Sequence, residues 1–235
     1  MKSFFVTGTD TGVGKTTVTS ALCAYCSIEK GLNVGVMKPF ESGLSLYGKD
    51  SLPWDAISLK EASGSQDDLA LINPYAFETP VAPQAASELE HVQIDLENLD
   101  MIYGRLKKEH EVVFIEGAGG ILVPIKKNFF FCDLMKRWKT SVIVISRLGL
   151  GTINHTLLTC RFLKIEGIRV AGVILNDTEG KTDAATKTNP DILSRYLDVP
   201  LMGIFPHIRR EETMDRKGLV EIVKKNLDMN PILTA

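Results

Sequence analysis

The residues with the clearest chemical purpose lie near the start of the chain, in the segment Gly8-Thr9-Asp10-Thr11-Gly12-Val13-Gly14-Lys15-Thr16-Thr17. A short apolar run precedes this segment and a helical pattern follows it, as in a phosphate-binding loop. The N–H groups that open such a helix face an anion, the lysine reaches the β- and γ-phosphates, and the Thr16 hydroxyl ligates Mg²⁺. The sequence therefore predicts a nucleoside triphosphate site.

The spacing of this loop departs from the common form of the motif. G-x-x-x-x-G-K-[ST] places a glycine five positions before Gly14, where this chain has Thr9. The nearest glycine, Gly8, lies one residue earlier. The loop is therefore a longer variant of the motif.

Polar and small side chains also follow later apolar runs, in the segments 38–43, 116–120, 147–155 and 176–177. Ligands of a parallel sheet bind at the carboxyl ends of its strands. Lys38 can balance phosphate charge there, or simply extend to solvent. Glu116 is suited to be a second ligand of Mg²⁺; the alternative is that it is a buried structural carboxylate. We expect a large polar site along this edge.

Three further polar residues have two interpretations each. Asp55 lies near a helix start, where acidic residues are common because of the helix dipole. Asn176 can pair with a base edge or act as a turn residue. His155 follows a glycine-rich helix start, and the capping or packing interpretation is preferred over a catalytic base.

The elements that must position these residues alternate between strands and helices. We expect strands over residues 4–7, 34–38, 112–116, 141–146, 170–176 and 201–205, and helices over 15–30, 54–63, 96–109, 133–138, 153–166, 190–196 and 216–227. Continuous apolar strands alternating with helices indicate an α/β fold with a mostly parallel sheet flanked by helices, a three-layer sandwich like that of P-loop NTPases. No linker or repeat interrupts residues 1–235, so one domain is expected.

Composition limits the remaining possibilities. The chain of 235 residues has a net charge of −2, which gives no support for nucleic-acid or anionic-membrane partners. No apolar run approaches the roughly 20 residues of a membrane span, and we expect a cytoplasmic protein. Cys23 and Cys26 form a C-x-x-C inside the first helix, where core packing is favoured over a redox or metal role.

The motifs together resemble those of the dethiobiotin synthetase family. The resemblance rests on V-T-G-T-D-T-G-V-G-K-T (residues 6–16), K-P-F-E-S-G (38–43), E-G-A-G-G (116–120) and G-L-G-T-I-N-H-T-L-L-T (149–159). It implies ATP-dependent carboxylation and ureido-ring closure of 7,8-diaminononanoate with CO₂ or bicarbonate, through a carbamate and a carbamic-phosphoric anhydride. It also implies a homodimer with composite active sites.

The resemblance assigns roles to residues as well. Lys15, Lys38 and Thr11 would be catalytic, with Thr11 and Ser42 near the carbamate or diamine. Mg²⁺ would be held by Thr16, Asp55 and Glu116. The nucleotide would contact Gly12, Val13, Gly14, Lys15, Thr16, Thr17, Asp55, Glu116, Gly117, Ala118, Gly119, Asn176, Asp177, Pro206, His207 and Ile208. The carboxylate of the substrate in the other subunit's site would be held by Gly151, Thr152, Ile153 and Asn154.

The chain departs from the family pattern at one position, and two other classes of protein are alternatives. The family often has Glu at the position of Gly12, so nucleotide preference is open here. Partition or septum-placement ATPases usually carry a second lysine early in the loop, where this chain has Thr9-Asp10-Thr11. Cobalamin-type synthases add a glutaminase domain, for which no residues remain.

Overall fold

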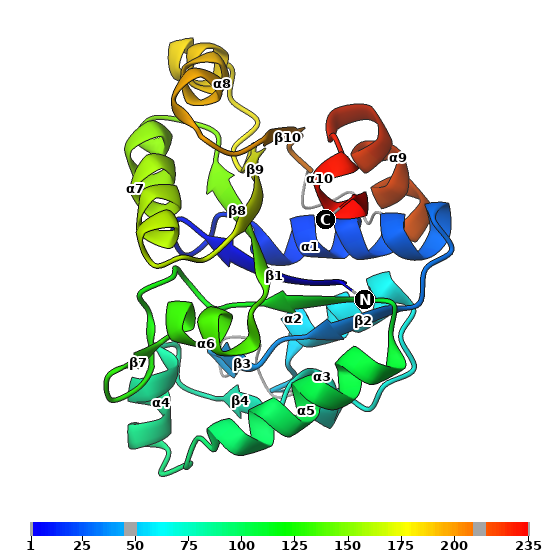
Figure 1. Cartoon of the computed structure of the whole chain (residues 1–235), viewed down its shortest axis with the longest axis vertical. Helices are drawn as coiled ribbons and strands as arrows, with labels where there is room; N and C mark the ends of the chain where they lie inside the picture. The colour runs from blue at the N-terminus through cyan, green and yellow to red at the C-terminus, as the bar shows by residue number, and fades with distance from the viewer. Residues whose placement is uncertain (1, 45–50, 209–214, 235) are drawn as a thin grey trace.

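The computed structural model describes residues 2–44, 51–208 and 215–234. Its main sheet has six parallel strands in the order β10-β9-β8-β1-β5-β2 (Figure 1). These are β1 (Lys2–Gly8), β2 (Val34–Met37), β5 (Val112–Glu116), β8 (Ser141–Arg147), β9 (Val170–Asn176) and β10 (Leu201–Phe205). All six match predicted strands, which confirms the parallel sheet.

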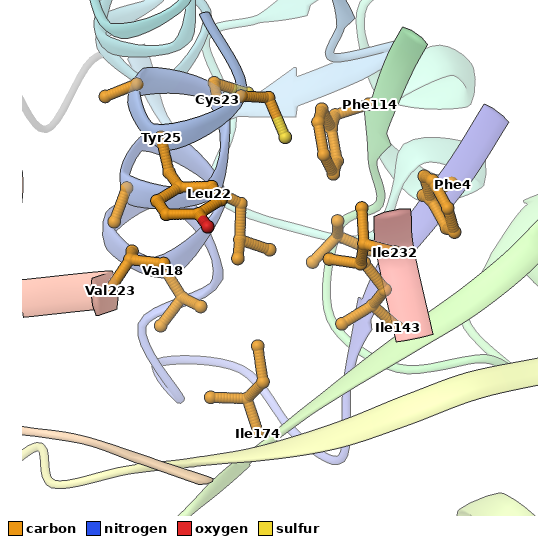
Figure 2. Close-up of a cluster of buried hydrophobic side chains, with 14 of the residues drawn as sticks. Phe4, Val18, Leu22, Cys23, Tyr25, Phe114, Ile143, Ile174, Val223 and Ile232 are labelled. Carbon is orange, nitrogen blue, oxygen red and sulfur yellow. The ribbon is translucent and has the colours of Figure 1, made fainter. Parts of the chain in front are cut away.

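Helices cover both faces of this sheet. One face carries α1 (Lys15–Ala24), α2 (Trp54–Ser63), α9 (Arg216–Asn226) and α10 (Asn230–Leu233), and the other carries α5 (Leu96–Glu109), α6 (Phe131–Trp138) and α7 (Thr152–Ile165). Successive β1 residues alternate between two cores: Phe4 packs in the first and Phe5 in the second (Figure 2 shows the first). The predicted three-layer sandwich is thus confirmed. Among the described residues, no helix has the length and apolarity to cross a membrane.

Several short elements were not predicted. Two small sheets pair β3 (Phe40–Ser42) with β4 (Tyr75–Phe77) and β6 (Pro124–Lys126) with β7 (Phe129–Phe130). Two short helices, α3 (Leu69–Ile72) and α4 (Pro83–Leu89), lie between β3 and α5. Elements this short hold too few residues to display a periodic hydrophobic pattern.

Three helix boundaries differ from the prediction by more than one residue. The helix expected to begin at Pro190 is α8 (Ala184–Tyr196), and Pro190 lies inside it. The Thr186 N–H donates to the Asp183 carboxylate, which caps this helix. The helix expected from Asp133 begins at Phe131, because Asp133 lies in its first turn and accepts from the Phe130 N–H. The first helix becomes a π-helical turn, η1 (Tyr25–Glu29), before it ends.

Cys23 and Cys26 lie in the core, as the packing interpretation requires. Both are buried and free, and the Cys23 sulfur points toward the Phe114 ring in Figure 2. Burial raises the pKa of Cys26 to about 12, so its reactive thiolate is scarce near neutral pH. This environment favours a structural thiol.

Candidate active site

The phosphate-binding loop connects β1 to α1 through two glycines in the left-handed region. Gly12 has φ 71° and Gly14 has φ 81°, and Gly14 is the N-cap of α1. A Cβ on Gly14 would lie 2.1 Å from Nδ2 of Asn176. Val13 is buried between them, while Thr17 is exposed in the first turn of α1. The loop conformation thus depends on glycine at position 14.

Lys15 opens α1 and folds back over the loop. It is 8% exposed, and its ammonium donates to the Asp10 carbonyl at 3.2 Å. Burial, together with the nearby positive charge of Lys38, lowers the pKa of Lys15 to about 8. A phosphate at the loop would stabilise the charged form that burial disfavours.

A cluster of buried charges stands beside the loop, and it unites residues from four separate parts of the chain. The Lys38 ammonium lies 2.5 Å from Oε1 of Glu116 and 2.9 Å from Oδ2 of Asp55. The Thr16 hydroxyl donates to the same Glu116 oxygen at 2.8 Å. Lys38 and Glu116 are 3% and 0% exposed. Every residue that the family resemblance assigns to the metal therefore converges on one point.

The electrostatics of this cluster keep Lys38 charged. Burial alone would lower the pKa of Lys38, but the Glu116 and Asp55 carboxylates outweigh it and raise the pKa above its usual range. Burial likewise opposes ionisation of Asp55, and the Lys38 charge outweighs it to lower the pKa of Asp55. Lys38 and Asp55 thus stabilise each other's charged form where little solvent reaches them.

The donor set of the cluster fits a small hard cation. Thr16, Asp55 and Glu116 offer a hydroxyl and two carboxylates, and oxygen is the ligand type that Mg²⁺ prefers. The Oε2 atom of Glu116 is buried and has no hydrogen-bond partner. Leaving a buried carboxylate oxygen unsatisfied is costly, and a cation at this place would satisfy it.

The glycine-rich segment after β5 lies against β1 and the phosphate-binding loop. The Gly117 N–H donates to the Val6 carbonyl at 3.0 Å, and the Lys38 ammonium lies 3.4 Å from the Gly117 carbonyl. A Cβ on Gly119 would lie 3.6 Å from the Thr11 hydroxyl, so these two predicted residues are neighbours. Ala118 is half-buried between Gly117 and Gly119.

The two predicted nucleotide segments beyond β9 and β10 lie side by side. The Asn176 amide donates to the Val13 carbonyl at 2.9 Å, which places it against the phosphate loop. The Asp177 N–H donates to the Phe205 carbonyl, and Nδ1 of His207 lies 3.3 Å from the Asp177 carbonyl oxygen. Pro206 and Ile208 flank His207 and are half-buried.

The segment Gly151–Asn154 divides into inward and outward residues. Thr152 is fully buried, and its hydroxyl lies 2.8 Å from that of Ser146, which lies 3.1 Å from the Thr9 hydroxyl. Gly151 and Asn154 are exposed, and Ile153 is half-buried. The Thr152 side chain is thus engaged inside its own chain, and its N–H donates to the Gly149 carbonyl. This segment offers a ligand its outward groups and the other N–H groups in the first turn of α7. His155 is exposed beside them.

Comparison with known proteins shows the family. A family model described as an AAA domain matches residues 2–214. The ATP-dependent dethiobiotin synthetase BioD of Thermodesulfovibrio yellowstonii is 41% identical over 239 residues, covering 98% of each chain. That of Bacillus subtilis (strain 168) is 36% identical over 233 residues, covering 99% of this chain and 98% of the relative. The chain belongs to the ATP-dependent dethiobiotin synthetase family.

Solved structures agree on the fold of this dethiobiotin synthetase family member. The septum site-determining protein MinD from Pyrococcus horikoshii OT3, complexed with Mg-ADP, is 20% identical with a TM-score of 0.55, covering 94% of this chain and 86% of that one. A ParA family ATPase from Chlorobium tepidum is 12% identical with a TM-score of 0.56, covering 95% and 91%. At these identities the likeness concerns the P-loop fold alone.

Sequence patterns did not indicate one buried carboxylate beside the charge cluster of this dethiobiotin synthetase family member. Glu41, in β3, is 3% exposed, and its two carboxylate oxygens accept from the N–H groups of Asp55 and Ala56 at 2.8 and 3.0 Å. It therefore caps α2 and holds Asp55 toward Lys38. Burial and the Asp55 charge raise the pKa of Glu41 to about 7, against those two hydrogen bonds. Its position three residues after Lys38 is the signal that could have found it.

We expect Glu41→Gln to loosen Asp55, because the NH₂ group that replaces one carboxylate oxygen cannot accept from the N–H group that it faces. Losing a helix cap costs about 1 kcal/mol of the free energy of unfolding. The Mg²⁺ concentration for half-maximal ATP turnover should rise several-fold, while the rate at saturating Mg²⁺ stays close to that of the wild type. Thermal unfolding and Mg²⁺ titration of turnover measure these effects. Glu61→Gln, at an exposed position of α2, is the control; equal behaviour of the two variants would contradict the role.

Proposed function

We propose that this chain converts 7,8-diaminononanoate, CO₂ and ATP into dethiobiotin, ADP and phosphate, a step of biotin biosynthesis. The observation that carries the proposal is the convergence of Lys38, Asp55, Glu116 and Thr16 beside the phosphate loop. Relatives of this name at 36–41% identity over nearly the whole chain support it. The single domain is proposed to carry the whole reaction.

The proposed chemistry has three steps. One amine of the diamine adds to CO₂ and loses a proton, which gives a carbamate. A carbamate oxygen then attacks the γ-phosphorus of ATP, and ADP leaves with the electrons of the broken P–O bond. In the last step the second amine attacks the carbamoyl carbon of the mixed anhydride, loses its proton, and phosphate departs as the ureido ring closes.

The residues of the chain supply positioning and charge to these steps. Phosphoryl transfer depends mainly on alignment and neutralisation of charge. Lys15 would hold the phosphates at the loop, and Lys38 would neutralise charge as the phosphoryl group moves. Thr11 and Ser42 would position the carbamate and diamine. Mg²⁺, held by Thr16, Asp55 and Glu116, would neutralise phosphate charge.

Recognition of the nucleotide base is proposed for the segments beside the loop. The amide of Asn176 offers both a donor and an acceptor, which suits an adenine edge. The Asp177 backbone and the segment 206–208 form the adjacent wall. A Cβ on Gly12 would meet nothing within 4 Å, so this position leaves open space where the family often has Glu.

A homodimer with composite sites forms part of the proposal, in the cytoplasm and without nucleic-acid or membrane partners. The exposed side of α7 and the turn before it carry large apolar residues: Leu150, Leu158 and Ile165 are 91%, 60% and 81% exposed. Leu158 and Ile165 are seven positions apart and share one helix face. A second copy covering this face would bury them and bring Asn154 to the neighbouring site.

We expect Leu158→Asp to break this dimer, because it places a charge in an apolar interface. Light scattering should give twice the chain mass of 25.9 kDa for the wild type and a single chain mass for the variant. Turnover should fall with the loss of the composite site. Met101→Asp, at a residue 67% exposed on α5, is the control and should remain dimeric. A monomeric wild-type protein with full activity would contradict the composite site.

The function is tested by incubating the protein with the diamine, bicarbonate and MgATP while phosphate and ureido product are measured. We expect one phosphate per ring formed. A nonanoate with a single amine is the control, since it cannot close a ring. ATP hydrolysis that is indifferent to the diamine would show that the assignment is wrong and would favour a switch-type ATPase.

A further inference from the structure

The main chain of Lys38 is held from the end of α3, a part of the chain outside the site described above. Its N–H donates to the Ile72 carbonyl at 2.7 Å, and its carbonyl accepts from the Asn73 side-chain amide at 2.7 Å. Ile72 is the last residue of α3, and Asn73 is the C-cap of that helix. Two neighbouring residues therefore fix both hydrogen-bonding groups of the Lys38 main chain.

Lys38 depends on this support because it lies outside the main sheet. β2 ends at Met37 and β3 begins at Phe40, so Lys38 belongs to neither strand. The next residue, Pro39, has no N–H with which to continue a ladder. The orientation of the peptide that joins Lys38 to Pro39 is therefore set by the Asn73 amide.

The Asn73 side chain donates to two carbonyls in a buried place. It is 7% exposed, and its amide nitrogen also donates to the Tyr75 carbonyl at 3.3 Å. The nitrogen must face these carbonyls, because in the flipped amide an oxygen would face two oxygens. Tyr75 is the first residue of β4, and its register partner in β3 is Phe40 (Figure 1). Asn73 thus ties Lys38 to the start of this small sheet.

The ammonium of Lys38 has little room for displacement. It lies 2.5 Å from Oε1 of Glu116 and 2.9 Å from Oδ2 of Asp55, and N–H···O hydrogen bonds span only about 2.7–3.2 Å. A turn of the Lys38 peptide changes the direction in which the side chain leaves the main chain. A shift of about 1 Å at a reacting group can cost about 10²-fold in rate. The Asn73 amide therefore acts on the ammonium through the main chain.

We propose that Asn73 is a positioning residue for Lys38, and that it holds the Lys38 carbonyl so that the ammonium meets the transferred phosphoryl group. The inference rests on the proposed function, in which Lys38 neutralises charge as that group moves. Asn73 acts through Lys38 and needs no contact with the nucleotide or the diamine. Loss of its amide should lower kcat and leave the KM for ATP nearly unchanged, because Lys15 and the phosphate loop keep their places.

Two variants separate positioning from folding. Asn73→Ala removes the donor to the Lys38 carbonyl, and we expect kcat to fall roughly 10- to 100-fold while the KM for ATP stays within about twofold. Tyr75→Phe is the matched control, because it keeps the ring that stacks on Phe40 and removes a 2.8 Å hydrogen bond from the Asp95 N–H. It should lower the unfolding temperature without lowering kcat. Wild-type kcat in Asn73→Ala, or an equal loss in Tyr75→Phe, would overturn the proposal.

A double-mutant cycle with Lys38→Gln shows whether Asn73 acts through the lysine. Asn73→Ala should cost little further kcat in the Lys38→Gln background, because the group that it positions is gone. An equal fold-loss in both backgrounds would show a structural role that is independent of Lys38 and would overturn the proposal. Asn73→Ser keeps a donor on a shorter side chain and should fall between the wild type and Asn73→Ala. It replaces the alanine variant in the cycle if that variant does not fold.

The same cycle is also measured by denaturant unfolding, which needs no turnover. Asn73→Ala should shift the denaturant midpoint less in the Lys38→Gln background than in the wild type, since part of its effect is to loosen the ion pairs of Lys38. Equal shifts would overturn the proposal. A wild-type protein without diamine-dependent turnover would contradict the proposed function alone, because unequal shifts would still show that Asn73 holds Lys38.

Discussion

Lys38→Gln should lose product formation by roughly 10²- to 10³-fold, the range seen when one charge-stabilising group is removed from an active site. The ammonium of Lys38 is the only cationic group within salt-bridge distance of Asp55 and Glu116 among the described residues. Its removal leaves two carboxylates close together in a buried place. Breaking a buried pair in this way costs about 3–5 kcal/mol. The variant should therefore also unfold at a lower temperature.

The stability of this variant should respond to Mg²⁺ more than that of the wild type does. With Lys38 absent, the two carboxylates need another cation, and Mg²⁺ is expected to restore part of the lost unfolding temperature. Turnover is measured well below that temperature, and Lys225→Gln, exposed on α9, is the control. Wild-type turnover in Lys38→Gln would remove Lys38 from catalysis, and a missing Mg²⁺ response would argue against the metal site.

Lys15→Gln should abolish activity to a similar extent but change stability in the opposite direction. Its ammonium makes one weak hydrogen bond in the described structure, to the Asp10 carbonyl. Burial and Lys38 hold the pKa of Lys15 near 8, below its ordinary value of 10.5. The folded state therefore disfavours this charge at pH 7, and a neutral side chain should raise the free energy of unfolding. Lost activity with gained stability marks a residue kept for function.

Calorimetry with ATP and denaturant unfolding measure the two effects of Lys15→Gln. ATP affinity should fall at least tenfold, because a charge-assisted contact to phosphate is lost. Lys30→Gln, near the far end of the same helical segment, is the matched control. A variant that binds ATP as tightly as the wild type would contradict the phosphate-contacting role, and a less stable one would contradict the burial argument.

The sequence predicted the sheet, and it placed most candidate site residues at the carboxyl ends of the strands, because both depend on local patterns. Continuous apolar runs mark buried parallel strands, and the site residues follow those strands directly. Lys38 and Glu116 could therefore be assigned from their places along the chain. Asp55 could not be decided from its helix start alone, since acidic residues favour that position for the dipole. Asp55 faces Lys38 because Glu41, a residue of β3, caps α2.

Other features depend on contacts that no local pattern records. The inward turn of Thr152 follows from hydroxyl partners on β8 and α7, namely Ser146 and Thr156. The start of α8 depends on the Asp183 cap, and Pro190 is a misleading signal for it because proline favours first turns. The charge cluster of Thr16, Lys38, Asp55 and Glu116 combines four separate parts of the chain. Such convergence becomes visible only in three dimensions.

Gly14 and Asn176 lie far apart in the chain, yet they cannot vary independently. A side chain at Gly14 would begin 2.1 Å from the Asn176 amide, so any change there must first displace the group proposed to recognise the base. The φ of 81° at Gly14 penalises such a change a second time. Across related sequences, a loss of glycine at this place should therefore be accompanied by a change at the asparagine, which couples phosphate binding and base recognition in evolution.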